Sequence, residues 1–535
     1  MNNTIQLYSD SEKNNKVYPI TSPDRVIDEN GNSIKEKLNI LSSSLDNIAH
    51  NGLVNTLYFE KSGLSDREII INAINFCINN NMGLMLNRIY VIDKEIILKD
   101  IEKLEINSHK HGGLKKGNNF IGESIISFIK CENITIKDCH IDGGNINFTS
   151  IDIGDYGIEF IECKYINFSN NIVENFGDSC LNIGKGGVDY NSCYSAIVKD
   201  NIFNNIYQVS TTPNGCDNYI FENNECNNIG AIKFATRESK LNSHIIIRGN
   251  RINVTKNSNY GIELSGYNNI SVINNFISGC RYAIGYYTND SSSSVVAVHG
   301  QNINITDNIC ENVNTLYYHQ NKAYIDGTSF ENNVIIKNNR LISPKKDTET
   351  QAIIITGVNS VNSIIENNYF EINKISGDNY FIHIDTKFNE KSKTIINNNT
   401  LPHMDNGILL QNRNSTSYGD VIIKYNNLKC DKKIISTVGT LNKITLEKCD
   451  IICGNEAISQ VLTHTNILEI KNNNIVKNGT VALNLKCNIG YMYDNTINTT
   501  GVSYRYDSGS TGTTYVSRNI VSGEISLNGQ TETKI

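Results

Sequence analysis

One short phrase recurs along this chain and constrains its fold more than any other feature. A β-rich stretch is followed by Asn, then one or two residues, then an apolar residue. Successive copies lie 22 to 33 residues apart, and Cys139 and Cys449 fill the Asn slot in two of them. A unit of this length cannot bury its own apolar face, so the units must stack. The repeated residues are Asn171, Asn201, Asn224, Asn250, Asn275, Asn308, Asn339, Asn368, Asn399, Asn426, Asn473, Asn495 and Asn519.

The segments between these residues have the periodicity of strands. Apolar and polar residues alternate, as in Ile134-Thr135-Ile136, and helical spacing is nearly absent between residues 125 and 535. Because Asn tolerates left-handed backbone angles, we expect the repeated Asn to turn the chain and to stack as a ladder. The pattern therefore predicts an all-β fold, a single-stranded right-handed parallel β-helix of about fifteen coils.

Composition excludes several classes of protein. The net charge is −7 and no basic stripe appears, so nucleic acid is not an expected partner. The 14 cysteines have no metal-ligand spacing, and we expect small buried side chains in a chain assembled in a reducing cytosol. We expect neither a secretory signal nor membrane insertion, because the first ten residues are polar and no run approaches a membrane span.

Four segments are expected along the chain. Residues 1–33 are polar and predict an extended strand-and-turn arm. Residues 34–50 predict a short coiled-coil helix, or a helix packed on its own chain. Residues 51–124 predict an entry and capping module, which contains an amphipathic helix over Asp66–Asn80, and residues 125–535 predict the β-helix. The heptad positions are Ile34, Leu38, Leu41, Leu45 and Ile48.

The capping module carries a family resemblance. The helix, the strand at Leu84–Leu86, the stretch RIYVIDKEIIL and the Asn coils resemble the entry module of the pectate-lyase-like superfamily, which opens many phage tailspikes and appendages. The segment VYPITSPDRVIDENGNSIKEKL resembles the virion-attachment leader of tail proteins from phages of low-GC hosts. The resemblance implies a homotrimeric tail appendage, made in the host cytoplasm and joined to tail, baseplate or neck proteins through its N-terminus.

The same resemblance implies a function at the host cell surface. We expect the protein to bind and depolymerise a surface polysaccharide, which could be capsule, exopolysaccharide or wall teichoic acid. No cofactor is expected. The superfamily admits bound Ca²⁺, but no acidic cluster in this sequence demands it.

The best candidate for chemistry lies between Asp152 and Gly187. With Ile158 and Leu181 in register, Asp155 falls on Asp178, and Glu159 falls on Asn182. In-register residues of adjacent coils lie about 4.8 Å apart. Two close carboxylates can cleave a glycosidic bond, one as acid and the other assisting attack. Asp155, Asp178 and Glu159 are therefore the predicted catalytic residues. The alternative is that Gly-Asp only forms the turn before a strand.

This window also resembles the polygalacturonase signature, through residues 155–159 (DYGIE) and 177–181 (GDSCL). The resemblance implies that Asp178 is the general acid. The second Asp of the signature is Ser179 here, the first-coil catalytic Asp falls on Tyr156, and no Gly-His-Gly counterpart is present. The chain therefore departs from a polygalacturonase in detail.

Further along, the register predicts a groove. Small residues share one slot (Gly157, Cys180, Ala231, Gly261, Ala283), and polar residues share the slot two positions on (Glu159, Asn182, Lys233, Glu263). Such a strip suits an extended glycan, or alternatively a neighbouring chain. The predicted substrate-binding residues are Lys233, Arg237, Glu263, Arg281 and Tyr282. Because the chain has 27 Tyr and no Trp, sugar stacking would fall to Tyr.

Three functions follow from these observations. A tailspike that hydrolyses a host glycan is favoured. A receptor-binding spike without catalysis is the first alternative, and a polysaccharide lyase that uses Arg237 or Lys233 is the second. A secreted bacterial pectin-type lyase is disfavoured by the attachment-like leader.

Overall fold

The computed structural model describes residues 49–50 and 52–534, apart from short internal segments. These segments are 110–111, 149–150, 185–190, 213–214, 236–241, 257–258, 288–301, 321–331, 343–350, 358–360, 372–374, 387–391, 413–418, 455, 463–464, 478–480, 507–511 and 527–530. The predicted arm and the heptad positions therefore lie outside the described residues, as does Arg237.

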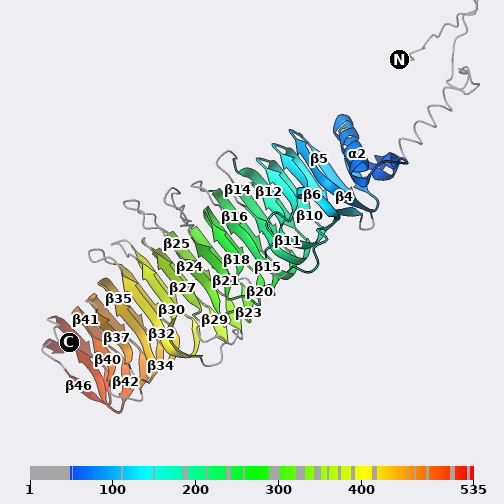
Figure 1. Cartoon of the computed structure of the whole chain (residues 1–535). Coiled ribbons are helices and arrows are strands. Elements are labelled where there is room, and N and C mark those ends of the chain that lie inside the picture. Colours follow the sequence, from blue (N-terminus) through cyan, green and yellow to red (C-terminus); the bar gives the residue numbers. More distant parts are fainter. Residues whose placement is uncertain are drawn as a thin grey trace, which may run out of the picture.

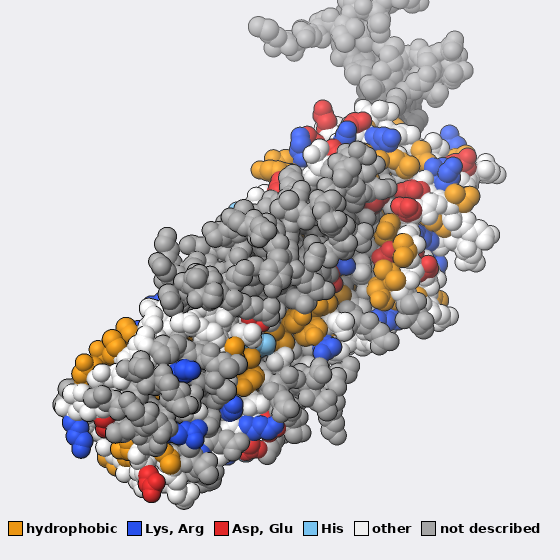
Figure 2. Space-filling model, turned by 60° about the vertical axis from the view of Figure 1, so that its left-hand side comes forward, with side chains coloured by type: hydrophobic (Ala, Val, Ile, Leu, Met, Phe, Trp, Pro, Cys, Tyr) orange, Lys and Arg blue, Asp and Glu red, His pale blue; other side chains and the backbone are white. Residues whose placement is uncertain are grey.

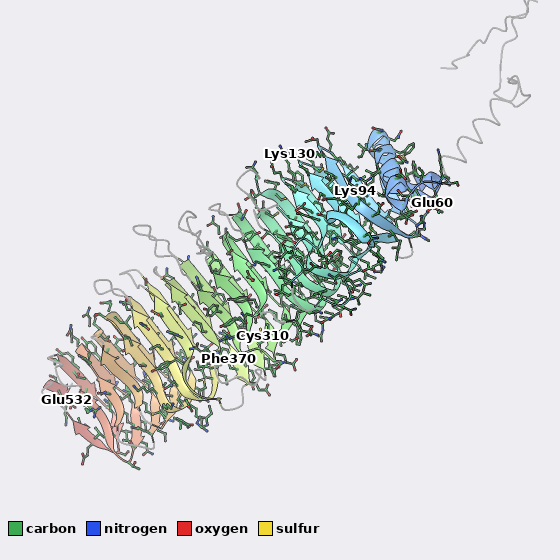
Figure 3. The ribbon with its side chains drawn as sticks, in the orientation of Figure 1. Glu60, Lys94, Lys130, Cys310, Phe370 and Glu532 are labelled. Atoms are coloured by element: carbon green, nitrogen blue, oxygen red, sulfur yellow. The ribbon has the colours of Figure 1, made fainter. Side chains whose placement is uncertain are left out.

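The chain folds as an elongated parallel β-solenoid, as the repeat predicted (Figure 1). Side chains project along the whole stack, from Glu60 near its first coils to Glu532 at its last (Figure 3). One sheet of 20 strands runs the length of the stack, and all of its pairs are parallel except β1 with β2. Its strands are β1 (Ala49–His50), β2 (Leu53–Asn55), β3 (Gly83–Leu86), β5 (Leu104–Ser108), β7 (Glu132–Lys137), β10 (Lys164–Ser169), β12 (Cys193–Lys199), β14 (Cys216–Glu222), β16 (Asn242–Arg248), β19 (Tyr267–Ile273), β22 (Asn302–Thr306), β25 (Asn332–Lys337), β28 (Val361–Glu366), β31 (Lys393–Asn397), β33 (Asp420–Lys424), β35 (Leu441–Glu447), β38 (Thr465–Lys471), β41 (Cys487–Tyr493), β44 (Thr513–Ser517) and β47 (Thr531–Lys534).

The remaining strands form the other sides of each coil. They are β4 (Ile89–Lys99), β6 (Gly113–Ile129), β8 (His140–Asp142), β9 (Tyr156–Ile161), β11 (Ile172–Ile183), β13 (Ile202–Thr211), β15 (Glu225–Ala235), β17 (Arg251–Val254), β18 (Tyr260–Ser265), β20 (Phe276–Ser278), β21 (Tyr282–Tyr287), β23 (Ile309–Glu311), β24 (Thr315–Gln320), β26 (Arg340–Ile342), β27 (Ile353–Gly357), β29 (Tyr369–Glu371), β30 (Ile375–Thr386), β32 (Thr400–Asn412), β34 (Asn427–Val438), β36 (Asp450–Cys453), β37 (Glu456–Leu462), β39 (Asn474–Lys477), β40 (Val481–Leu485), β42 (Thr496–Thr499), β43 (Val502–Tyr506), β45 (Ile520–Val521) and β46 (Glu524–Ser526).

The stack begins earlier than the Asn motif does. Strand β3 pairs in parallel with β2, and β5 pairs with both β3 and β7, so the first coils lie within residues 51–124. The helix α2 (Asp66–Asn80) has the bounds that the sequence predicted. Ser65 and Glu68 form a capping box at its N-terminus, and Ile70, Ala73, Ile74 and Cys77 are buried, as predicted. A 3-10 helix, η2 (Thr56–Phe59), precedes it.

The repeated Asn residues form a buried ladder. Each side-chain amide donates to the Oδ1 atom of the next repeated Asn, at 2.9–3.1 Å from Asn171 through Asn426 and again from Asn473 through Asn519. Where Cys139 and Cys449 replace Asn, only the backbone N–H donates to the next Asn, at 3.0 and 2.9 Å. The ladder satisfies polar groups inside the stack, where an unpaired one is costly.

The residue that makes the turn is not the ladder Asn itself. Positive φ angles occur one position earlier, for example 56° at Asn170, 56° at Asp200 and 53° at Asn223. Our expectation that the repeated Asn adopts the left-handed conformation is therefore wrong by one residue. The physical reason is that two neighbouring residues have separate roles. An exposed residue, Asn or Asp in these examples, adopts the left-handed conformation of the turn, and the buried Asn after it forms the ladder.

The interior is apolar and is stacked in register. Aromatic rings follow one another from coil to coil, as in Phe128 on Phe160 with ring centroids 5.2 Å apart, and Phe203 on Phe221 at 6.0 Å. All 14 cysteines are buried free thiols, as the sequence predicted. On the outside, acidic and basic side chains are interspersed over the described part of one face (Figure 2). Many pair between adjacent coils, for example Arg248 with Glu222 at 2.5 Å.

Candidate functional site

The candidate site lies where the chain departs from the regular coil. Between β8 and β9, the described residues 143–148 and 151–155 form an excursion instead of a tight turn. Backbone hydrogen bonds fasten it to the next coil, from Asn145 N to Asn175 O at 3.1 Å and from Asp152 N to Gly177 O at 2.8 Å. Glycine is required at position 143, because a Cβ atom there would lie 2.3 Å from the Asn175 carbonyl oxygen.

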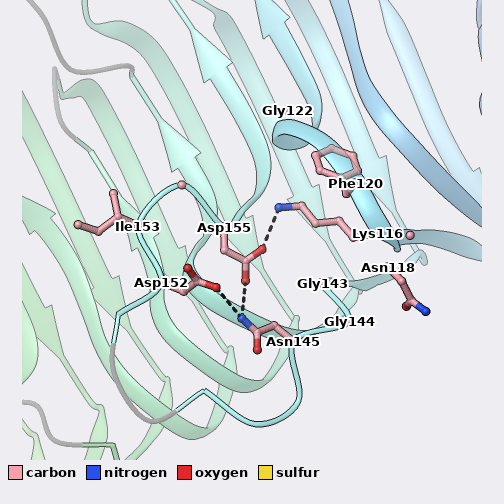
Figure 4. A pocket seen from close by; sticks show the side chains of 12 residues that line it. Lys116, Asn118, Phe120, Gly122, Gly143, Gly144, Asn145, Asp152, Ile153 and Asp155 are labelled. Atoms are coloured by element: carbon pink, nitrogen blue, oxygen red, sulfur yellow. Dashed lines mark hydrogen bonds and ion pairs between the residues drawn. The ribbon is translucent and has the colours of Figure 1, made fainter.

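A cavity of about 580 Å³ lies between this excursion and β6 (Figure 4). Its lining combines glycines and amides with three charged side chains, Lys116, Asp152 and Asp155. The other lining residues are Gly117, Asn118, Phe120, Gly122, Gly143, Gly144, Asn145, Ile153 and Gly154.

Lys116 is the buried cation of the cavity. Its Nζ atom lies 2.9 Å from Asp155 Oδ1, donates to the Glu123 carbonyl oxygen at 2.8 Å, and sits 4.9 Å from the centre of the Phe120 ring. The Lys116 and Asp155 side chains are only 8% and 13% exposed. Burial lowers the pKa of Lys116, and the neighbouring Asp155 opposes this shift.

Asn145 joins the two acids of the cavity. Its Nδ2 atom donates to Asp152 Oδ2 at 3.0 Å and also lies 3.4 Å from Asp155 Oδ2 (Figure 4). Asp155 Oδ2 further accepts the backbone N–H of Gly177 at 2.6 Å. Because the two acids share one donor, their Oδ2 atoms lie within the combined length of those two contacts. Two carboxylates therefore lie on one wall of the cavity, linked through one amide group.

The predicted register of β9 with β11 is present at Ile158 and the two residues after it, but the pairing does not extend to Asp155 and Asp178, whose contacts differ from the expectation. Leu181 pairs with Ile158, as predicted. Asp155 accepts from Gly177 N, and Asp178 Oδ2 accepts from Gly154 N at 3.1 Å, so each carboxylate binds the residue that precedes the other acid. Asp178 is buried at 5% exposure and does not line the cavity. The turn geometry of the two Gly-Asp pairs, which strand spacing alone does not predict, accounts for the difference.

Glu159 lies in a buried polar column. Its carboxylate accepts from Asn182 Nδ2 at 3.0 Å and from Ser127 Oγ at 3.1 Å, and the side chain is 2% exposed. The column continues through Thr211, which pairs in register with both Asn182 and Lys233. The sequence register skipped Thr211, because a bulge between Gln208 and Thr211 shifts that coil by one residue. Glu159 is thus separated from the cavity wall.

The predicted small-residue strip does not form an open groove. Cys180 and Ala283 belong to the apolar core, and Gly157, Ala231 and Gly261 are buried as well. A Cβ atom at Gly157 would lie 2.2 Å from the Cys180 carbonyl oxygen, so the coils are in close contact here. The residues of the strip are small because the adjacent coils pack closely at these positions.

The predicted substrate-binding residues that the structure describes, Lys233, Glu263, Arg281 and Tyr282, lie several coils beyond the cavity. Lys233 and Glu263 pair in register and form an ion pair at 3.0 Å. Arg281 lies 5.1 Å from the centre of the Tyr282 ring, and that ring stacks on Tyr260 and Tyr318 with centroids 5.2 and 4.4 Å apart. None of these described residues lines the cavity.

Lys116, Asn145 and Asp152 are the site residues that sequence reasoning missed. Lys116 is 39 positions away from Asp155, and no sequence motif marks it as a site residue. A usable signal was the spacing of the repeat, because the step from Cys139 to Asn171 is one of the longest and contains the excursion. Among the described residues, no group of three or more His, Cys, Asp and Glu side chains could hold a metal ion. No described helix is long and apolar enough to cross a membrane.

Known proteins show only distant similarity to this chain. No family model and no curated protein matches the chain. The chain is similar to the N-terminal fragment of bacteriophage phi29 gene product 12, at 12% identity over 93% of this chain and 96% of that one, with a TM-score of 0.47. It is similar to a family 28 exopolygalacturonase of Yersinia enterocolitica, at 12% identity over 80% and 78%, with a TM-score of 0.37. For the tailspike of E. coli bacteriophage HK620, the identity is 11% over 95% and 84%, with a TM-score of 0.34.

Proposed function

We propose that this chain is a phage tailspike or tail appendage that binds a host surface glycan in the cavity beside Lys116 and cleaves it by hydrolysis. The observation that supports this most is the pair of carboxylates, Asp152 and Asp155, held on one cavity wall by Asn145. Two carboxylates and room for a sugar are what acid–base cleavage of a glycosidic bond requires. The virion context rests on the resemblance of the leader and the entry module.

The contacts of the two acids suggest different roles. Asp155 faces an ammonium group and a backbone N–H, and an ion pair needs an ionised carboxylate. We therefore assign it to assist attack, as base or nucleophile. Asp152 has no ion-pair partner within the described part of the chain, and we assign it to donate a proton to the leaving oxygen. Asp178 stays the alternative acid, one turn away, where it holds Gly154.

Glycan binding without cleavage is the second candidate. Both oxygens of Asp155 already have partners, Lys116 on one and Gly177 and Asn145 on the other. A carboxylate satisfied in this way can also be purely structural. The cavity would then hold the glycan through Asp152, Asn145 and Asn118.

The test is cleavage of purified capsule, exopolysaccharide and wall teichoic acid from susceptible hosts. Reducing ends, absorbance of unsaturated uronates and retained glycan binding should be followed together. We expect reducing ends without absorbance, and losses of about 10²–10⁴-fold in Asp155→Asn and Asp152→Asn. Lys115→Met is the matched control, because Lys115 lies on the same strand and pairs with Asp142 at 2.7 Å with 40% of its side chain exposed.

Each alternative has its own outcome. A loss in Asp178→Asn but not in Asp152→Asn would move the acid role to Asp178. Absorbance would indicate a lyase. Binding that persists without any product would leave the non-catalytic spike, and the absence of both binding and product would reject the cavity as a glycan site.

A further inference from the structure

We propose that the cavity selects a sugar unit that carries a protonated amine and rejects units that carry a carboxylate or phosphate group. This inference rests on the proposed function only in that the cavity binds a glycan; it does not depend on cleavage. Binding of an ammonium group needs Asp152 as a carboxylate, so for such a ligand the acid role passes to the alternative acid, Asp178. The observations that carry it are the charge balance of the cavity wall and the contacts that already occupy its one cation.

The cavity has more acidic than basic groups. Lys116 is the only cation among its lining residues, against Asp152 and Asp155. A third carboxylate, Glu95, lies directly behind the wall, because a Cβ atom added at the lining residue Gly122 would be 2.9 Å from Glu95 Oε2. Lys256, a cation near the excursion, lies over the Phe148 ring at 4.3 Å and is not among the lining residues.

The single cation has little capacity left for an anionic ligand. The Lys116 ammonium contacts Asp155 at 2.9 Å, the Glu123 carbonyl oxygen at 2.8 Å and the face of the Phe120 ring. Two of its three N–H donors are used, and with 8% of its side chain exposed the ammonium group would have to move away from Asp155 to bind a ligand carboxylate fully. Asp155 would then remain buried without a counter-charge, which is unfavourable.

Asp152 differs from Lys116, because one of its oxygens can still bind a ligand. Asp152 Oδ2 accepts from Asn145 Nδ2, while Asp152 Oδ1 has no hydrogen bond within the described residues. Its neighbour Ile153 is 84% exposed, so this part of the wall faces solvent. A carboxylate oxygen in this position can accept N–H or O–H donors, and an ammonium donor also supplies the missing positive charge.

Repulsion of the wrong ligand therefore sets the preference, along with attraction of the right one. A uronate or phosphate placed in the cavity is repelled by Asp152 and Asp155, and Lys116 is already paired with Asp155. An amino sugar meets Asp152 directly. We expect about tenfold or more between cationic and anionic oligosaccharides of equal length at low ionic strength, with the neutral form between them.

The test is calorimetric titration of the full chain with three matched probes. These are a β-1,4-glucosamine oligomer with its amines protonated, the fully N-acetylated oligomer, and a uronate oligomer of the same length. We expect affinity in that order, and added salt should weaken the first and strengthen the third. Asp152→Asn should narrow the gap, whereas Lys115→Met should leave it unchanged.

The outcomes separate this inference from the proposed function. Tighter binding of the uronate by the wild type, or an affinity gap that Asp152→Asn leaves as wide as in the wild type, overturns the charge preference and leaves glycan binding intact. The opposite salt dependences on the wild type decide the matter even if that variant misfolds. If only a native host glycan binds, chemical N-acetylation of that glycan should weaken binding, and undiminished binding contradicts the inference. Failure of every glycan rejects the proposed function itself.

Discussion

The Asn ladder and the cavity wall both depend on Asn side chains. In the ladder these side chains stabilise the fold, whereas in the cavity they line a candidate site. In the ladder, Asn224 receives two N–H groups from Asn201 and donates to Asn250 and to the Val198 carbonyl oxygen, so its polar atoms are satisfied by a pattern repeated in each coil. In the cavity, Asn145 bonds to Asp152 and Asp155, which belong to no repeated position, and the wall that they form opens to solvent. Repetition makes a polar residue part of the scaffold, and departure from the repeat makes it available for a ligand.

The largest expected effect comes from breaking the buried ion pair of the cavity. Lys116→Met leaves Asp155 buried without its cation, which should lower the free energy of unfolding by about 3–5 kcal/mol. Arg340→Met removes a surface ion pair with Glu371, in which the two side chains are 50% and 54% exposed, and should cost about 0–1 kcal/mol. Denaturant unfolding, or the unfolding rate if the transition is irreversible, checks both. Equal losses would mean that the Lys116 pair is not buried as described.

Interrupting the ladder should have the next largest effect. Asn224→Ala removes the acceptor for two N–H groups of Asn201 and leaves them buried, for an expected cost of about 2–4 kcal/mol. Asn227→Ala, in which the lost contact is a local bond to Glu225, is the control. A cost for Asn224→Ala no greater than for this control would show that the ladder does not stabilise the stack.

Extending the ladder should produce a smaller effect with the opposite sign. Cys139 occupies a ladder position but accepts and donates less than an amide does. Cys139→Asn lets a side-chain amide reach the Oδ1 atom of Asn171, and we expect a gain of about 0.5–1.5 kcal/mol in the same unfolding measurement. A loss would indicate that the thiol is needed for packing at this coil.

The smallest effect is a dependence on pH. Because the pKa of Lys116 is lowered in the folded state, the unfolded chain binds more protons between that pKa and the ordinary lysine value of 10.5. The stability of the wild type relative to Lys116→Met should therefore rise with pH in that window and be lowest below it. Unfolding of both proteins at a series of pH values checks the sign, and a falling difference would contradict the burial of Lys116.

The fold could be predicted from the sequence because it repeats. Each Asn copy reports the same turn, and helix α2 carries its own cap at Ser65 and its own apolar face. The site could be located only in part. Of the predicted catalytic residues, only Asp155 lines the cavity, and it was named because it lies next to an in-register strand. The register of Glu159 with Asn182 was correct. Lys116, Asn145 and Asp152 were missed, because the path of a single excursion depends on contacts such as Asn145 with Asn175 that no periodicity encodes.

The most direct test compares one substitution in the two regions. Asn145→Ala and Asn224→Ala should be assayed side by side for thermal unfolding and for glycan binding, with cleavage included where the wild type shows it. We predict that Asn145→Ala keeps a near-normal unfolding temperature and loses glycan binding or cleavage. Asn224→Ala should unfold at a lower temperature and keep full function while it is folded. The reverse pattern, or a loss of both properties in both variants, would contradict the division between scaffold and site.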